Sequence, residues 1–173
     1  MTVRNAEQAQ PNEFEFSITR TFDAPRELVW KAFSEAERLA QWWGPKGGKI
    51  RVAKLEFRPG GIFHYAMGLP NGGEMWGRFI YREVVAPERL VYVNSFSDAN
   101  GGVTRAPMNA NFPLEVLNNL TFAESAGKTL LTIRGQPLDA SAEELQTFKG
   151  FFPSMQKGFG GTLDQLAEYL AKA

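Results

Sequence analysis

The last third of the chain carries apolar residues at alternating steps of three and four. This spacing places them on one face of a helix. A helix with a bulky apolar face must cover it with another layer, and the preceding segments read as strands. The pattern therefore predicts a C-terminal helix that lies against a sheet. The apolar stripe consists of Leu145, Phe148, Phe152, Met155, Phe159, Leu163, Leu166 and Leu170.

Three glycines interrupt this helical pattern: Gly158, Gly160 and Gly161. Each costs roughly 1 kcal/mol of helix stability relative to alanine. The glycines therefore indicate either a close approach of another backbone or space left open beneath the helix. Open space between a helix and a curved sheet would hold a small apolar molecule.

The start and the continuity of the terminal helix can also be inferred. Ser141 with Glu144 forms a capping box, which is typical of a helix N-terminus. Pro153 cannot lie inside a straight helix without cost. We expect either a kink at this proline or two helices, over about 142–150 and 153–171.

Composition excludes several functional classes. The 173 residues include 19 basic and 19 acidic side chains, so no charge excess favours nucleic acid. The chain has no cysteine and one histidine, which argues against zinc sites and cysteine nucleophiles. No apolar run is long enough to span a membrane. We expect a cytoplasmic protein, either a monomer or a weak homodimer, without cofactor or metal.

The chain divides into a short tail and one domain. Residues 1–12 are polar and patternless, which predicts a disordered tail before a single domain over 13–173. Alternation from Phe14 to Phe22 predicts a half-buried strand. Two short helices follow: Pro25 is expected as the first helical residue of one, and Ser34 with Glu37 as a capping box of the other.

Turn signals separate the middle of the chain into further strands. Short turns between neighbouring strands predict an antiparallel meander. The segment 98–113 lacks any period, so we expect a long loop that is a candidate lid. The expected strands span residues 49–57, 62–68, 74–85, 89–97, 114–123 and 128–136.

Six stretches of the chain carry a resemblance through their order and spacing. They are FDAPRELVWKAF at 22–33, QWWGP at 41–45, FRPGG at 57–61, GRFIYREVVAPERLVY at 77–92, FAESAGKTLLTI at 122–133 and GFGGTLDQLAEYL at 158–170. By these stretches the chain resembles the START-like (helix-grip, SRPBCC) superfamily, and within it bacterial proteins related to the C-terminal domain of the heat-shock-protein-90 ATPase activator. The aromatic residue after the helix glycine, commonly Trp in these relatives, is Phe159 here.

The resemblance implies an α+β helix-grip fold. In this fold a curved antiparallel sheet of about seven strands wraps around a long C-terminal helix, and two short helices follow the first strand. It implies a deep cavity between sheet and helix but not one activity, because relatives include lipid carriers, hormone receptors and polyketide cyclases. The site must therefore decide the function.

Aromatic and methionine side chains are the candidate ligand-binding residues. Along 62–68 the set containing Tyr65 is expected to face the cavity, which places His64 on the opposite face and outside any catalytic role. The face that Asn118, Asn119 and Arg134 occupy stays open. The candidates are Trp42, Trp43, Phe63, Tyr65, Met67, Phe79, Tyr81, Phe152, Met155 and Phe159.

Three functions remain under consideration. The first is non-catalytic binding of a small hydrophobic or aromatic ligand. The second is a cyclase- or hydrolase-like enzyme acting on a polyketide-like substrate, in which Tyr65, Tyr81 or a cavity arginine polarises a carbonyl. The third, a co-chaperone-type interaction with heat-shock protein 90, rests on the name of the family alone. No catalytic residue is assigned.

Overall fold

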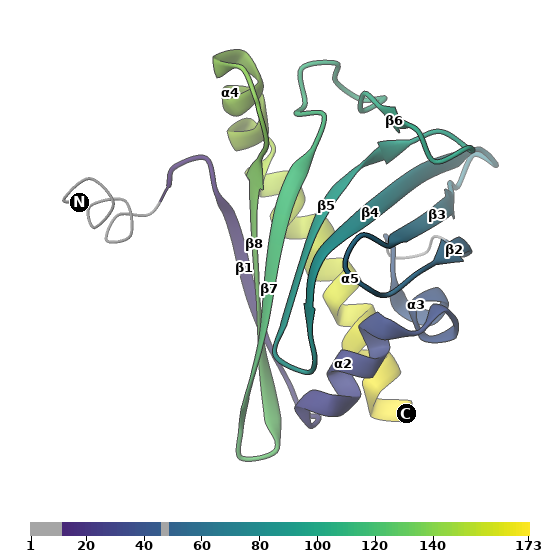
Figure 1. Cartoon of the computed structure of the whole chain (residues 1–173), viewed down its shortest axis with the longest axis vertical. Coiled ribbons are helices and arrows are strands. Elements are labelled where there is room, and N and C mark those ends of the chain that lie inside the picture. Colours follow the sequence, from purple (N-terminus) through teal and green to yellow (C-terminus); the bar gives the residue numbers. More distant parts are fainter. Residues whose placement is uncertain (1–11, 46–48) are drawn as a thin grey trace.

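A computed structural model describes residues 12–45 and 49–173. It shows an α+β fold in which a curved antiparallel sheet wraps a long C-terminal helix, as the resemblance implied (Figure 1). The predicted tail, apart from Asn12, lies outside the described residues. The elements are β1 (Phe16–Phe22), α2 (Arg26–Ser34), α3 (Ala36–Trp42), β2 (Lys49–Leu55), β3 (Ile62–Gly68), β4 (Glu74–Val85), β5 (Arg89–Ser97), β6 (Val103–Thr104), β7 (Val116–Ser125), β8 (Lys128–Pro137), α4 (Ala142–Gly150) and α5 (Phe152–Lys172).

The sheet has the strand order β1-β8-β7-β5-β4-β3-β2, with every pair antiparallel. Neighbours in sequence pair in the β2–β5 part and in β7–β8, so the predicted meander is confirmed. β1 pairs with β8 and forms one edge of the sheet. The segment 98–113, expected as a loop, contains the two-residue strand β6, which pairs with β5. Within the described residues, no helix is long and apolar enough to cross a membrane.

The predicted start and division of the C-terminal helical region are confirmed. The Ser141 hydroxyl accepts a bond from the Glu144 N–H at 3.1 Å, and the Glu144 carboxylate accepts one from the Ser141 N–H at 2.9 Å. α4 ends at Gly150, and α5 then begins with Pro153 in its first turn. A proline in the first turn costs little, because its missing N–H would have no helical partner there.

The predicted boundaries of the two short helices need correction. Ser34 does not cap α3; it ends α2, and its hydroxyl donates to the Lys31 carbonyl at 3.1 Å. Glu35 is the N-cap of α3 and makes no side-chain cap bond. Pro25 is the N-cap residue of α2 instead of its first helical residue. Ser34 is still helical, and the extended residue between the two helices is Glu35, so Ser34 lies one position too early to cap α3.

The two halves of α5 meet different surroundings. Leu163, Leu166 and Leu170 in the C-terminal half are buried in the core. Met155 and Phe159 in the N-terminal half are only partly buried. The apolar stripe of α5 therefore packs into the core in the C-terminal half of the helix and is only partly covered in the N-terminal half.

Polar contacts hold α5 in place from two directions. The Arg20 guanidinium on β1 pairs with the Asp164 carboxylate at 2.9 Å. On the other side, the Arg38 guanidinium on α3 donates to the Tyr169 hydroxyl at 2.9 Å. Figure 1 shows α2 and α3 gathered near the C-terminal end of α5. The helix is thus anchored along its C-terminal half.

The turn before β3 requires glycine at Gly61. A β-carbon there would overlap the carbonyl oxygen of Glu56. The neighbouring Gly60 has a positive φ of +83° and donates its N–H to the Tyr81 carbonyl at 2.7 Å. The backbone of this turn therefore packs directly against β4.

We predict that Gly61→Ala lowers the free energy of unfolding by about 2 kcal/mol or more, because the Glu56 backbone cannot move away cheaply. Gly160→Ala is the matched control: its β-carbon meets nothing within 4 Å, and in a helix the change adds up to about 1 kcal/mol of stability. Urea denaturation measures both. Equal effects of the two substitutions would contradict this account of the turn.

Candidate functional site

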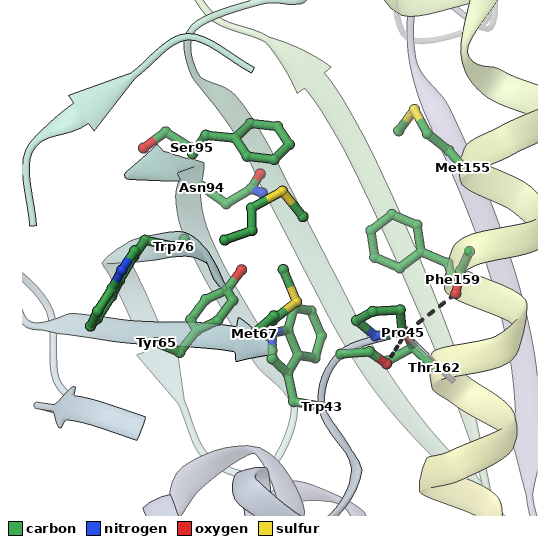
Figure 2. Close-up of a pocket in the computed structure, with 15 residues that line it drawn as sticks. Trp43, Pro45, Tyr65, Met67, Trp76, Asn94, Ser95, Met155, Phe159 and Thr162 are labelled. Atoms are coloured by element: carbon green, nitrogen blue, oxygen red, sulfur yellow. Dashed lines mark hydrogen bonds between the residues drawn. The ribbon is translucent and has the colours of Figure 1, made fainter. Parts of the chain in front are cut away.

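A pocket of about 330 Å³ lies between the inner face of the sheet and the N-terminal half of α5 (Figure 2). The strands that line it are β3, β4 and β5, and the segment after α3 closes one side. Its volume falls at the lower end of the range of about 300–1,000 Å³ typical of small-molecule sites. The pocket is therefore the candidate functional site.

The helical wall comes from one face of α5. Met155, Gly158, Phe159 and Thr162 line the pocket at steps of three and four. A β-carbon on Gly158 would meet nothing within 4 Å. The sequence analysis gave two explanations for the glycines of this helix, open space or a close approach of another backbone. At Gly158 the structure shows open space. The Phe159 ring stacks on the ring of Phe16 in β1, with ring centroids 5.6 Å apart.

The sheet wall depends on a glycine that faces a tyrosine. Tyr65 on β3 pairs with Gly77 on β4, and the next inward pair is Met67 with Met75. A β-carbon on Gly77 would lie 2.5 Å from the Tyr65 hydroxyl oxygen. The missing side chain therefore lets the phenol ring lie across β4. Figure 2 shows its hydroxyl directed toward the middle of the lining residues.

Hydrogen bonds from α5 hold the segment that closes the pocket. The Thr162 hydroxyl donates to the Gly44 carbonyl at 2.9 Å. The Gln165 amide donates to the carbonyls of Trp42 at 3.0 Å and Gly44 at 2.8 Å. Trp43 lies between these two carbonyls, so its position follows that of the helix.

The indole of Trp43 packs into the inner face of the sheet. It makes edge-on contacts with Tyr65, at a centroid distance of 6.1 Å, and with Phe79, at 5.3 Å. Its Nε1–H is buried and has no hydrogen-bond partner in the described part of the chain. The Nε1 atom has no surface open to the pocket, and the group that lies beside it is the Tyr65 phenol.

An amide pair supplies a further polar group. Asn94 lines the pocket, and its side-chain oxygen accepts a bond from the Asn118 amide at 2.7 Å. Asn118 is buried on the inner face, which resolves the orientation of β7 that the sequence left open. Asn119 therefore faces the outer side, as does the exposed Arg134. Alternation along β5 from the buried Tyr92 was the signal that could have identified Asn94.

The pocket wall contains few groups able to exchange a proton. Burial raises the pKa of Tyr65 from 10 to about 12, and the nearby Trp43 indole opposes this rise. That indole lies close to the phenol without completing a regular hydrogen bond. Among the described lining residues there is no carboxylate, lysine, arginine or histidine. The wall can thus donate hydrogen bonds while remaining uncharged at neutral pH.

Five of the ten candidate residues line this pocket and five do not. Those on the wall are Trp43, Tyr65, Met67, Met155 and Phe159. Those away from it are Trp42, Phe63, Phe79, Tyr81 and Phe152. Contact with a ligand stays a prediction for all of them. The wall also includes Met75, Gly77, Asn94, Phe96 and Gly158, which the sequence analysis did not assign to the site.

The candidates away from the wall belong to the aromatic core. Phe63 and Phe79 form the pair next to Tyr65 and Gly77 on the same face of strands β3 and β4, and both are buried. Tyr81 lies one step further along β4. These rings form the layer on which the pocket residues pack.

The remaining two candidates pack elsewhere. The Trp42 indole donates to the Ala32 carbonyl at 2.9 Å and is buried against α2. Phe152 contacts Phe16 and Phe148, with centroid distances of 5.6 and 5.4 Å. Each therefore supports the core near an end of the pocket.

His64 lies on the outer face of the sheet, opposite Tyr65, as expected. Its ring stacks on Trp76 at a centroid distance of 4.7 Å. Its Nε2–H donates to the Asp98 carbonyl at 3.0 Å. The histidine is buried beneath the turn after β5, and it is not among the residues that line the pocket. Across residues 12–45 and 49–173, no group of side chains suited to a metal ion occurs.

We predict that Gly77→Ala destabilises the protein by about 1–3 kcal/mol, because the new methyl group forces the Tyr65 phenol out of its place. In a Tyr65→Val background the same substitution should cost much less. A double-mutant cycle with urea denaturation measures the coupling. Equal costs in the two backgrounds would show that the tyrosine does not depend on the glycine.

The buried tyrosines predict a loss of stability at high pH. Burial raises the pKa of Tyr65 to about 12, and it also raises those of Tyr81 and Tyr92. In the unfolded chain these phenols ionise near pH 10. Between pH 10 and 12 the unfolded state therefore binds fewer protons, and the free energy of unfolding falls as pH rises. Below pH 10 their contribution is fully present.

Urea denaturation between pH 9 and 11 measures this slope. Tyr65→Phe should make it shallower by up to about 1.4 kcal/mol per pH unit, because one titrating group is removed. Tyrosinate absorbance should appear together with unfolding for the buried phenols. An unchanged slope in the variant would contradict the assignment to Tyr65.

Comparison with known proteins agrees with this architecture. Protein Ms6760 from Mycobacterium smegmatis is 28% identical, with a TM-score of 0.74 over 91% of each chain. A protein from Arthrobacter aurescens is 24% identical, with a TM-score of 0.78 over 95% of this chain and 91% of its own. The latter shows likeness of fold alone. None of the curated proteins matches the chain.

One family model covers most of the sequence. It describes the Activator of Hsp90 ATPase homolog 1-like protein and matches residues 23–171. This match and the helix-grip architecture confirm the resemblance drawn from the sequence motifs. The chain therefore belongs to the family of Activator of Hsp90 ATPase homolog 1-like proteins, within the START-like superfamily.

Proposed function

We propose that this protein binds a small, uncharged, largely apolar molecule in the pocket between the sheet and α5, without changing it chemically. One observation carries the proposal: the pocket is lined by aromatic and methionine side chains, and Tyr65 is the one ionisable group among its described lining residues. Such a wall matches the usual composition of small-molecule sites, which are mostly apolar with a few placed polar groups.

Burial of apolar surface would supply the affinity. Each square ångström removed from water contributes about 25 cal/mol, less the cost of ordering the ligand. Met67, Met75 and Met155 line the pocket. Methionine side chains are flexible and polarisable, so they adapt to ligands of different shape. The pocket is therefore suited to a class of related molecules.

A charged ligand fits this wall poorly. Moving an ionised group out of water is costly unless an opposite charge or several hydrogen bonds compensate. The described wall offers no opposite charge to either sign of ion. Neutral ligands are consequently favoured.

The enzyme hypothesis receives less support. Of the groups that the sequence analysis considered for polarising a carbonyl, Tyr65 lies on the described wall, whereas Tyr81 does not and no arginine does. Hydrolysis or cyclisation also needs a base or nucleophile, and the high pKa of Tyr65 makes it a poor base near neutral pH. The hypothesis of a co-chaperone rests on the family name and gains nothing from the pocket.

The proposal can be tested with the neutral fluorescent probe N-phenyl-1-naphthylamine and two matched variants. Gly158→Leu places a side chain at the pocket wall, whereas Gly160→Leu adds the same side chain two residues away, off the described wall. We predict saturable binding to wild type, affinity on the order of tenfold weaker for Gly158→Leu, and little change for Gly160→Leu. Fluorescence titration gives the dissociation constants.

Two results would contradict the proposed site. If both variants lost the same amount of probe affinity, the cause would be a destabilised helix, which circular dichroism and urea denaturation would detect. Unchanged binding in Gly158→Leu would place the probe elsewhere on the molecule.

A further inference from the structure

The wall of the pocket differs in composition from the hydrophobic core beside it. The core is rich in leucine, isoleucine and valine, whereas the described lining residues include none of the three. The large apolar side chains of the wall are methionines and aromatic residues instead. Resting on the proposed function, we infer that the pocket selects flat aromatic molecules over saturated molecules of the same size.

On the sheet, the inward positions that line the pocket form two layers. In one layer, Gly77 on β4 lies between its two cross-strand partners, Tyr65 on β3 and Phe96 on β5. In the next layer, Met67 on β3 pairs with Met75 on β4. The sheet therefore presents aromatic rings in one layer and two thioether groups in the next.

The helical wall has the same composition. Met155 and Phe159 lie one turn apart on α5 and both line the pocket. Phe16, which is not a lining residue, stacks on one face of the Phe159 ring, so the other face or the edge remains for a ligand. Figure 2 shows Met155 and Phe159 across the pocket from Met67 and Tyr65. A molecule held between the two walls would therefore meet sulfur and aromatic rings on both sides.

Such a wall interacts more favourably with an aromatic ring than with a saturated one. Aromatic pairs in offset-stacked or edge-to-face geometry are stabilised beyond the area that they bury. The sulfur of methionine also interacts favourably with an aromatic ring, often at the ring edge. A saturated ligand makes neither kind of contact, so its affinity depends on the burial of its surface alone.

Burial of apolar area by itself predicts the opposite preference. A saturated ring system carries more hydrogen atoms and exposes more apolar surface than its aromatic counterpart, so its transfer out of water is more favourable. A pocket lined by branched aliphatic side chains would therefore bind the saturated molecule more tightly. The sign of the preference distinguishes the two kinds of wall.

The test compares 2-naphthalenemethanol with its fully saturated counterpart, decahydro-2-naphthalenemethanol. Both probes are neutral alcohols, so their polar groups are matched. We predict that wild type binds the aromatic alcohol on the order of fivefold more tightly than the saturated one. Displacement of N-phenyl-1-naphthylamine measures both dissociation constants.

Substitutions at the wall assign the preference to particular side chains. Met75→Leu and Met155→Leu keep an apolar side chain of similar volume and remove the sulfur. Each should lower the aromatic preference by about twofold, and Phe159→Leu should lower it as well. Because each variant is tested with both probes, a general loss of packing cancels in the ratio. The control Leu130→Met adds a thioether at a position that is 44% exposed and outside the lining residues, and it should leave the ratio unchanged.

Nuclear magnetic resonance of protein labelled at the methionine methyl groups gives a direct readout. The chain has five methionines, and replacing each in turn by leucine identifies its signal. The aromatic alcohol should shift the methyl signals of Met67, Met75 and Met155 through its ring current, and the saturated alcohol should shift them much less. The Met108 side chain is exposed and outside the lining residues, so its signal should stay in place with either probe.

The outcomes separate this inference from the proposed function. Equal or tighter binding of the saturated alcohol would overturn aromatic selection and leave apolar binding in place. If wild type bound neither alcohol nor N-phenyl-1-naphthylamine, both proposals would be wrong. An aromatic preference of unchanged size in Met75→Leu, Met155→Leu and Phe159→Leu would show that the wall does not produce it, and this result would also overturn the inference.

Discussion

The carbonyl of Gly44 connects the two parts of the molecule that form the pocket. It accepts hydrogen bonds from Thr162 and Gln165, which lie on one face of α5. The Thr162 hydroxyl also lies 3.2 Å from the Gly158 carbonyl, and its single hydrogen serves one acceptor at a time. These bonds fix the segment after α3 relative to the helix, and Trp43 is carried by that segment. The geometry of the pocket therefore depends on this contact.

The same helix performs two tasks because its apolar stripe meets two kinds of partner. Near the C-terminus, Leu163 and Leu166 pack into a close core with α2, α3 and the sheet. Near the N-terminus, Met155 and Phe159 line the pocket together with the part of the sheet in which the Tyr65 ring covers Gly77. Ordinary side-chain volume thus decides where the core ends and where the pocket begins.

Alternation along the strands predicts which residues face the inside of the sheet. It does not predict which of these line the pocket and which lie in the core. Alternation correctly placed Tyr65 inward and His64 outward. It could not distinguish Phe63, which is in the core, from Met67, which is on the pocket wall, because both share a face. In the structure, Phe63 packs against Tyr65 and Phe79 in the core, whereas Met67 lines the pocket. Asn94 was missed although alternation along β5 places it inward with Tyr92; its hydrogen-bond partner, Asn118, lies on another strand and cannot be inferred from that pattern.

The sequence by itself determined the order and type of the elements other than β6, the capping box at Ser141, the division of the terminal helices at Pro153 and the family. These features arise from local physics: periodicity, capping and the missing N–H of proline. Tertiary structure alone decided which inward aromatics remain accessible, and that the indole of Trp43 is left without an acceptor. Those properties depend on strand register and on hydrogen bonds between residues far apart in the chain, and no local pattern records either of them.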